Sequence, residues 1–393
     1  MVRANKSKIG VDCERSMQEA SPLIGRGLKV KFPHSEGFHK EVKDRVNRYF
    51  ITTGLKPRGL KSAYFKTVLL LAWLLTSYVL LVFVARHWWQ SVPLSLSLGM
   101  AMAGVGFNLP HEAGHEAYSS RRFINSLVAT TLDLIGGSSY CWKWKHNFIH
   151  HTYTNISGAD DDIDIRPLLH LTPGQPRRWL HRYQHLYVWL LYCLLPLRWY
   201  FYADFAVIYH GEIGGHKIPR PRGWDLLILL GGKALFFYLA FVLPLTAHGF
   251  WAVVIFYLLA SFTSGLLLSV LILISHCVQE AKFPTPLSGT NRMETEWAVH
   301  QVETTVGYAR GNRLLTWYLG GLNFPIEHHL FPQICHVHYP ALAGIVESVC
   351  AEYDVKYFAH NTLLSALVSH YRFLRIDKSQ FCRRGANIAT NAR

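Results

Sequence analysis

Histidines recur in this sequence at three places, with spacings that suit metal binding. The chain has 22 histidines among 393 residues, and imidazole is the commonest metal ligand among protein side chains. The three clusters are His111 and His115; His146, His150 and His151; and His328 and His329. Residues four apart lie on one face of an α-helix, so the two rings of the first cluster can address one centre. A single cluster is typical of hydrogen-bonded histidines near a helix end, but the recurrence favours a metal site.

The second cluster has the spacing to serve two metal ions. In an α-helix His146 and His150 share a face, whereas His151 is turned away by about 100°. The adjacent histidines His150 and His151 would then point to different ions. Seven histidines are too many ligands for one ion, and nitrogen ligands without a thiolate suit iron, zinc, copper or nickel. The sequence therefore predicts a dimetal site.

Two other classes of protein also use such histidines. The sequence HEAGH at residues 111–115 fits the HExxH pattern of zinc proteases. A zinc protease would, however, leave the other five clustered histidines without a role. A haem-binding or transport protein would need histidines at bilayer depth on facing helices, whereas these clusters lie at the ends of apolar stretches. Both alternatives are weaker than a dimetal enzyme.

The composition indicates a membrane protein with substantial polar regions outside the bilayer. The chain is 50% hydrophobic and 17% charged, with a net charge of +15. At this apolar content the expected partner of the basic surface is an anionic membrane leaflet, and no nucleic-acid partner is predicted. The seven cysteines are scattered without a CxxC pair, so we expect free thiols.

Four apolar stretches are long enough to span a hydrocarbon core of about 30 Å. They cover residues at about 64–85, 93–109, 225–247 and 250–275, and short connections join them into two hairpins. The turn of the second hairpin has no Lys or Arg, whereas the N-terminal segment 1–62 and the C-terminal tail 371–393 are basic. The positive-inside rule then places both termini and the histidine clusters in the cytoplasm.

Shorter elements complete the expected fold. Two more apolar stretches cover residues 123–137 and 186–202. If either crossed the membrane alone, the segment after it would change sides and the hairpin arrangement would be lost, so we interpret both as interfacial helices. Apolar residues recur at helical spacing between residues 38 and 50, which predicts an amphipathic cytosolic helix. The expected fold class is an all-α membrane protein with four transmembrane helices in two hairpins, interfacial helices, and a cytosolic helical cap that holds the dimetal site.

The three clusters resemble the histidine boxes of the membrane fatty acid desaturases, whose patterns are HxxxH, then HxxHH or HxxxHH, then H/QxxHH. The longer phrases HNFIHHTYTNISGADDDID and GGLNFPIEHHLFPQICHVHYPAL are similar to the bacterial acyl-CoA or acyl-lipid branch, near the linoleoyl-CoA (front-end) desaturases. The resemblance extends from about residue 30 to about residue 371. It implies a desaturase domain over residues 63–370, a cofactor of two iron ions, and O₂ as co-substrate.

The function implied by the resemblance is O₂-dependent desaturation of a fatty acyl chain, carried by coenzyme A or by a lipid. The enzyme would introduce a C=C bond and so take part in lipid metabolism and the synthesis of unsaturated fatty acids. A membrane di-iron hydroxylase of an acyl or alkyl substrate has similar boxes and is the alternative. The mass of the product separates the two reactions.

The metal ligands implied by the resemblance are the seven box histidines and one histidine at the end of the fourth membrane helix. They are His111, His115, His146, His150, His151, His276, His328 and His329. The third box departs from the family pattern, because Pro325 stands where the family has His or Gln. His300, in the phrase WAVHQVETT, is the candidate to replace that ligand or to support one.

Carboxylates close to the boxes are expected to orient the ligands. A metal-bound imidazole usually donates its second N–H to a carboxylate or a carbonyl. The run ADDDID follows the second box, and Asp161 and Asp164 are the predicted partners, with Glu327 beside the third box. A solvated loop is the alternative for such a charge run. Trp142 and Trp144, before the second box, are expected to line a substrate tunnel or to anchor the chain at the interface.

The sequence also predicts the partners of such an enzyme. We find no Rossmann glycine fingerprint, no Cys₄ iron–sulfur spacing and no haem motif of a fused cytochrome domain. A separate electron donor is therefore expected, either a ferredoxin or a cytochrome b5-like protein with its reductase. Such donors are typically acidic, so the basic surface would steer them. Membrane lipids and a fatty acyl substrate are the other partners, and the expected location is a bacterial inner membrane.

Overall fold

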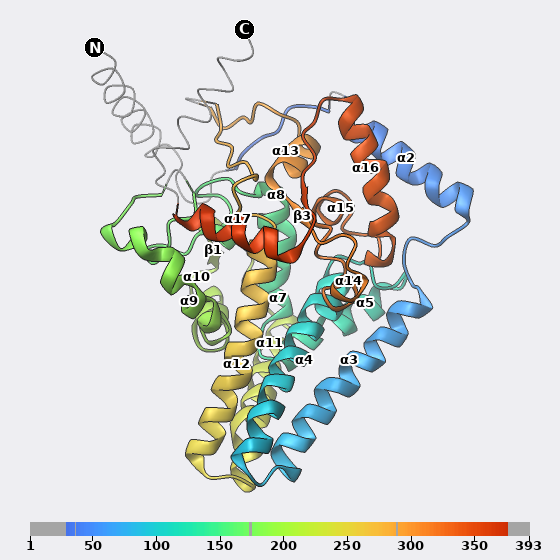
Figure 1. The fold of residues 1–393 in the computed structure, drawn as a ribbon. Helices are drawn as coiled ribbons and strands as arrows, with labels where there is room; N and C mark the ends of the chain where they lie inside the picture. The colour runs from blue at the N-terminus through green and yellow to red at the C-terminus, as the bar shows by residue number, and fades with distance from the viewer. Residues whose placement is uncertain (1–28, 36, 173–174, 288–289, 376–393) are drawn as a thin grey trace.

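Four long apolar helices form the narrow half of the molecule, and shorter helices cover one of its ends (Figure 1). The structure is a computed structural model that describes residues 29–35, 37–172, 175–287 and 290–375. The candidate membrane spans are Lys61–Val84, Trp88–Gly114, Trp224–Thr246 and Phe250–Leu273. They begin and end within a few residues of the stretches expected from the sequence. Most of the predicted basic tail, residues 376–393, lies outside the described residues, as do residues 1–28.

Helices make up most of the described chain, and the strands are short. The helices of the first half are α2 (Phe38–Thr53), α3 (Lys61–Val79), η2 (Leu80–Val84), α4 (Trp88–Gly114), α5 (Arg122–Ala129), α6 (Thr131–Leu134), α7 (Ser139–Trp142), η3 (Lys143–His150), α8 (His151–Tyr153), η4 (Asp161–Ile163), η5 (Trp179–Tyr183) and α9 (Gln184–Arg198). The elements that follow are η6 (Trp199–Ala203), α10 (Asp204–His210), β1 (Glu212–Ile213), β2 (His216–Lys217), α11 (Trp224–Phe237), η7 (Tyr238–Val242), η8 (Pro244–Thr246) and α12 (Phe250–Leu273). The last are α13 (Trp297–Thr304), β3 (Gly307–Tyr308), α14 (Arg313–Tyr318), α15 (Pro325–Leu330), η9 (His336–His338), α16 (Tyr339–Glu352), β4 (Ala359–His360) and α17 (Leu363–Arg375).

Helix α4 is the central membrane helix. In its most apolar 18-residue window 56% of the residues are buried, compared with 22%, 17% and 33% for the spans of α3, α11 and α12. Gly99 allows α4 to approach α12 closely, because a Cβ atom there would lie 2.4 Å from the carbonyl oxygen of Ala260. Small residues at such crossings are typical of helix packing in membranes, where backbones must come close to gain van der Waals contact. The first histidine box lies at the end of this well-fixed helix.

The two extra apolar stretches form short helices beside the membrane spans. Residues 123–137 form α5 and α6, and residues 186–202 fall in α9 and η6. Neither stretch is among the helices long and apolar enough to cross a membrane in the described part of the chain. Large apolar side chains on both, such as Phe123 and Leu186, are exposed. This exposure suits helices that lie against lipid. The expected class of an all-α membrane protein with four spanning helices is confirmed.

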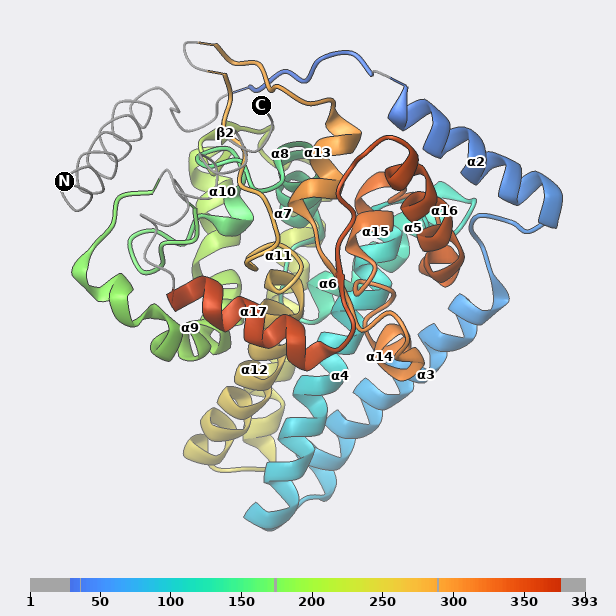
Figure 2. The same cartoon turned by 45° about the horizontal axis from the view of Figure 1, so that its top comes forward.

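The cap consists of the helices that gather around the ends of α4 and α12 (Figure 2). The predicted amphipathic helix is α2, and its apolar side packs against α16 and α13. Two-stranded pairings complete the cap: β1 pairs antiparallel with β2, and β3 pairs parallel with β4. The second pairing joins the segment after α13 to the segment before α17 and so closes the cap around the histidines.

Candidate metal centre

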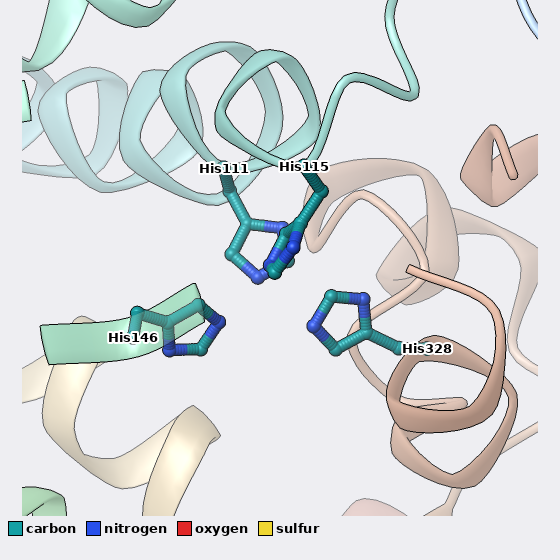
Figure 3. A group of neighbouring side chains, drawn as sticks. All are labelled: His111, His115, His146 and His328. Atoms are coloured by element: carbon teal, nitrogen blue, oxygen red, sulfur yellow. The ribbon is translucent and has the colours of Figure 1, made fainter. Parts of the chain in front are cut away.

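Histidine rings from four segments converge where the cap meets the ends of α4 and α12. One group consists of His111, His115, His146 and His328, and a second consists of His150, His276 and His329. Within each group, one ring nitrogen from every residue lies within 4.8 Å of the others. Figure 3 shows the four rings of the first group turned toward a common point. The structure therefore brings the three boxes and His276 together.

His151 stands between the two groups. Its ring centroid lies 4.6 Å from that of His115 and 4.7 Å from that of His328, both in the four-histidine group. On the other side its ring stacks on that of His329, with centroids 4.3 Å apart. The box histidines thus form one continuous assembly with His151 at its middle.

A π-helical turn sets the directions of the second box. Residues Lys143–His150 form η3, in which the backbone N–H of His151 donates to the carbonyl of His146 five residues earlier. The wider turn places residues five apart on one face. The Nε2 atoms of His146 and His151 accordingly lie 3.2 Å apart, whereas His150 turns to the second group. The sequence predicted an α-helix for this segment, with His146 and His150 on one face. The segment is π-helical instead; the rings of His146 and His150 do stack, with centroids 5.2 Å apart, but the two histidines belong to different groups.

The histidine nitrogens at the centre fit a bound cation. Buried nitrogens without a hydrogen-bond partner occur on His111, His115, His150, His151, His276 and His328. A buried polar atom without a partner is costly, which indicates that these atoms have another ligand. Two nitrogens that each lie about 2.1 Å from one ion at a right angle are about 3 Å apart. The separation of 3.2 Å between the His146 and His151 nitrogens matches this geometry.

Burial keeps most of these rings in the neutral form that binds metals. It lowers the pKa of His115, His151, His328 and His329 well below the usual value for histidine, and the neighbouring imidazoles lower it further. His150 differs, because Asp160 and Asp162 outweigh the effect of burial and raise its pKa.

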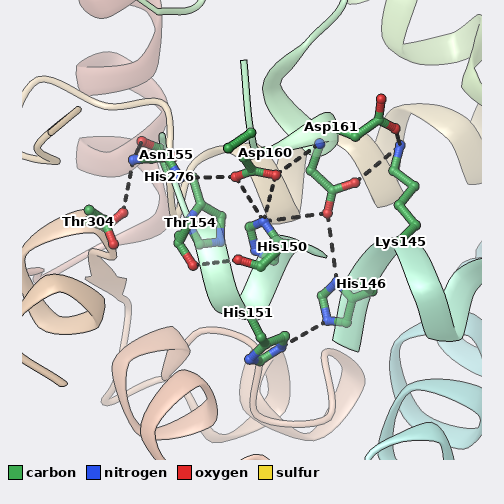
Figure 4. A network of polar contacts seen from close by, with 12 residues as sticks. Lys145, His146, His150, His151, Thr154, Asn155, Asp160, Asp161, His276 and Thr304 are labelled. Atoms are coloured by element: carbon green, nitrogen blue, oxygen red, sulfur yellow. Dashed lines mark hydrogen bonds and ion pairs between the residues drawn. The ribbon is translucent and has the colours of Figure 1, made fainter. Parts of the chain in front are cut away.

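Two aspartates hold the second box from behind (Figure 4). A carboxylate oxygen of Asp160 lies 3.1 Å from Nδ1 of His150, and one of Asp162 lies 3.7 Å from Nδ1 of His146. The predicted residues point elsewhere, because Asp161 pairs with Lys145 at 2.9 Å and Asp164 pairs with Arg166. The short helix η4 begins at Asp161, and its turn leaves Asp160 and Asp162 facing the box while Asp161 faces Lys145.

The third box has supports that were not predicted from the sequence. Nδ1 of His329 lies 2.8 Å from the Gln301 side-chain oxygen, and Nδ1 of His328 lies 3.3 Å from the Tyr339 hydroxyl. A signal for Gln301 was present, since it is a polar residue in the mostly apolar phrase WAVHQV. Glu327, predicted to orient a ligand, instead accepts a hydrogen bond from the Tyr357 hydroxyl at 2.9 Å. Burial raises its pKa to about 7.

His300 lies outside both groups. Its Nε2 lies 2.9 Å from the carbonyl oxygen of Thr154, and its ring packs edge-on against Phe32. The expected replacement of the ligand at Pro325 therefore does not come from His300. Pro325 is at the start of α15, where a proline is favoured because its missing N–H would have no helical partner. The four-histidine group forms without a side-chain ligand at this position.

A separate polar cluster supports the first box. The carboxylate of Glu112 accepts from the backbone N–H of His336 at 3.0 Å and lies 2.9 Å from its Nδ1. Nε2 of His336 lies 3.1 Å from the ammonium of Lys66, which is buried in α3. These contacts tie α3 and α4 to the segment that follows the third box. Because the lysine nitrogen occupies the free side of the imidazole, the cluster is better suited to hold the boxes together than to bind another ion.

Trp142 covers the membrane side of the four-histidine group. Its ring stacks on that of His146 with centroids 4.6 Å apart, and it contacts His111 and His115 edge-on. A Cβ atom on Gly114 would lie 2.3 Å from the indole, so the glycine makes this position possible. Trp144 lies farther from the group and stacks on Phe148. Of the two tryptophans, Trp142 is therefore the one in ring contact with the box histidines.

Comparison with known proteins agrees with this geometry. The fatty acid desaturase family profile matches residues 86–361. The sn-1 linoleoyl-lipid 6-desaturase of Arthrospira platensis is 37% identical over 348 residues, which cover 88% of this chain and 94% of the relative. The enzyme of the same name from Synechocystis sp. is 36% identical, with 88% and 97% covered. An acyl-lipid (8-3)-desaturase of Physcomitrium patens is 34% identical, with 88% and 73% covered. The chain thus belongs to the fatty acid desaturase family and is a membrane enzyme that introduces double bonds into fatty acyl chains.

Proposed function

We propose that this enzyme is an O₂-dependent desaturase of acyl chains carried on membrane lipids, with two iron ions at the centre. The observation that carries the iron assignment is the pair of all-histidine groups joined through His151. The lipid carrier rests on the relatives, which are named sn-1 linoleoyl-lipid 6-desaturase and acyl-lipid (8-3)-desaturase. A linoleoyl lipid is therefore the first substrate to test.

The ligand set of the proposal is the four-histidine group for one ion and the three-histidine group for the other, with His151 available to both. Bound iron would supply the activation of dioxygen and the removal of two hydrogens from an unactivated pair of methylenes, which no side chain can perform. The chain's own residues position the ligands. Asp160, Asp162 and Gln301 orient the rings from behind, and Trp142 closes the side that faces the membrane.

We place both termini and the cap in the cytoplasm of a bacterial cell, with the four helices in the inner membrane; the basic N- and C-terminal segments support this orientation. A separate ferredoxin or cytochrome b5-like protein with its reductase would deliver the electrons, since no redox-cofactor motif was found in the sequence.

Expression in a host with a defined lipid composition tests the reaction. We expect a product two mass units lighter than the fed acyl chain, and mass spectrometry of the lipid classes locates both the double bond and the carrier. A product one oxygen heavier would instead make the enzyme a hydroxylase. Iron in the purified protein is expected, and zinc in its place would contradict the di-iron assignment.

Histidine substitutions test the ligand set with a matched control. Alanine at His111, His150 or His329 should abolish desaturation while the protein still inserts into the membrane. Alanine at His87 or His248 should be tolerated, because both lie at the turns opposite the cap, next to the starts of α4 and α12. Equal losses in the two sets would show that the ligand set or the orientation is wrong.

A further inference from the structure

We propose that Trp297 carries electrons from the separate donor protein to the metal centre. This inference rests on the proposed function, because it assumes a metal centre that an external donor reduces. Conversion of one O₂ to two waters takes four electrons and four protons. The acyl chain provides two electrons and two protons as it loses two hydrogens, so two one-electron donors and two solvent protons must supply the rest. A defined path from the protein surface to the histidines is therefore needed.

Trp297 makes a direct hydrogen bond to the middle of the histidine assembly. Its indole N–H donates to the carbonyl oxygen of His151 at 3.1 Å. The His151 ring lies within 4.3–4.8 Å of rings in both histidine groups. Electron transfer through a hydrogen bond and packed rings is faster than transfer across an open gap of the same length. An electron that arrives at Trp297 thus reaches either metal position by a short path.

Trp297 also lies on the side of the molecule that a soluble donor can reach. It is half-buried at the first turn of α13, and its ring lies 5.5 Å from that of His39 in the first turn of α2. The backbone N–H of His39 donates to the Glu296 carboxylate at 3.0 Å, which fixes the two helix starts together. Trp142, whose ring does contact box histidines, packs instead within the membrane-side core around Leu132 and Ile135.

The surface around Trp297 suits a brief contact with a small protein. Exposed Lys40 and Lys43 lie in α2 close to His39 in the chain, and exposed Arg292 and Glu294 precede α13; Lys40 pairs with Asp44 at 3.4 Å. Electron-transfer complexes are small and short-lived, so a few charged residues around one aromatic side chain are sufficient. The occupant that we infer is a one-electron carrier protein with an acidic face. Each transfer oxidises one carrier and reduces the metal centre by one electron, and no bond to Trp297 forms or breaks.

The test compares the variants Trp297→Phe and Trp317→Phe. Trp317 is a tryptophan of the cap in α14, and its ring packs beside Lys66 of α3. Reduced ferredoxin or reduced cytochrome b5, whichever supports wild-type turnover, is mixed with each protein in lipid nanodiscs. We expect Trp297→Phe to slow oxidation of the donor by about tenfold or more, and Trp317→Phe to match the wild type. Single turnover driven by dithionite through a small mediator should be the same in all three. A loss in both assays would make Trp297 merely a structural support for His151, and no loss in either would place the path elsewhere; both results overturn the inference.

A second measurement does not depend on activity. The oxidised donor is added to metal-free protein, and hydrogen exchange is followed by mass spectrometry. We expect protection of residues 37–43 and 292–297, whereas protection confined to other surfaces would contradict the inference. If the wild type desaturates with dithionite but with neither donor, the inference and the proposed donor class fail, and the proposed desaturation reaction stands. If it forms no product under either condition, the proposed function itself fails.

Discussion

Single residues behind the histidine rings determine how the site is built. The Asp160 carboxylate faces His150, and it also accepts from the backbone N–H groups of Asn155 and Asp162. These contacts fix the carboxylate before any metal binds. A supporting residue that is itself held in place can fix the direction of a ligand ring and thereby its affinity for the ion.

Asp160→Asn should weaken metal binding about 10-fold to 100-fold, because His150 loses a charged partner for its Nδ1–H. Asp161→Asn is the matched control, since Asp161 pairs with Lys145 and with no box histidine among the contacts of the described residues. Iron content after dialysis against a graded chelator series measures the effect. Equal retention of iron by the two variants would show that Asp160 does not support the ligand.

The histidines of the site could be predicted from the sequence, but not all of the side chains that support them. Histidine spacing identified the seven box histidines, and the family resemblance added His276; the structure brings all eight together. Four aspartates within five positions gave no indication of which would face the box, because that depends on the turn at η4. Gln301 was missed for a related reason: its contact with His329 joins α13 to α15, and local spacing contains no information about contacts between distant segments.

At the scale of elements, Asn155 joins the second box to two other segments. Its side-chain amide contacts the carbonyl oxygens of His276, Lys282 and Thr304 at 3.0–3.1 Å. Its backbone has a φ of 59°, a left-handed conformation in which asparagine is enriched. The residue is fully buried, so these carbonyls have no access to water if the amide is removed. The box, the end of α12 and the end of α13 are thereby held at one point.

Asn155→Ala should lower the free energy of unfolding by about 3 kcal/mol, because buried carbonyls lose their donor and the φ remains unfavourable. Thermal unfolding of the metal-free protein in detergent measures the change and keeps it separate from metal loss. Asn291→Ala, at an exposed position, should change stability by no more than about 0.5 kcal/mol. A small effect at Asn155 would mean that the segments are held by other contacts.

The hairpins and α2 were predictable because hydrophobic length and periodicity are local properties of the chain. The spans found in the structure lie close to the expected residues, and the buried side of α2 is the predicted one. The π-helical turn of η3 was not predictable in this way, since the same apolar pattern is compatible with an α-helix. Only the structure reveals this turn, through the hydrogen bond from His151 N–H to the His146 carbonyl and the closeness of the two rings.

On the scale of the whole molecule, the polar cap and the apolar helices separate two environments. The net charge of +15 belongs to a chain whose spans contain few charged residues, so the basic groups gather outside the membrane. An acidic electron donor would be attracted over distances of about 10 Å at moderate salt, and added salt shortens that range.

Turnover with a protein donor should therefore slow markedly as salt is added at saturating acyl substrate. Dithionite-driven turnover is the control and should change little, because it needs no protein encounter. The rates are measured by product formation at several salt concentrations. A donor-driven rate that is independent of salt would exclude electrostatic steering as a use of the basic surface.

Acid should destabilise the cap through His370 in α17. Its ring lies between the Tyr192 hydroxyl and the Cys277 carbonyl, and burial lowers its pKa to about 4. The unfolded chain has the ordinary value of about 6.5. The neutral, buried His370 therefore contributes its full share to the free energy of unfolding above pH 6.5. This contribution falls by up to about 3 kcal/mol as the pH decreases from 6.5 to 4. In metal-free protein, the difference in melting temperature between wild type and His370→Gln should narrow over this range; a constant difference would contradict the shift.

The π-helical turn at the second box explains how its histidines can have the longer of two spacings. In a box of the form HxxHH on an α-helix, the first and last histidines are four apart and share a face. This chain has the form HxxxHH, with one more residue between His146 and His150. The wider turn absorbs the extra residue, so the first and last histidines share a face again. The two spacings therefore place the first and last histidines of the box on one face in two different helical geometries.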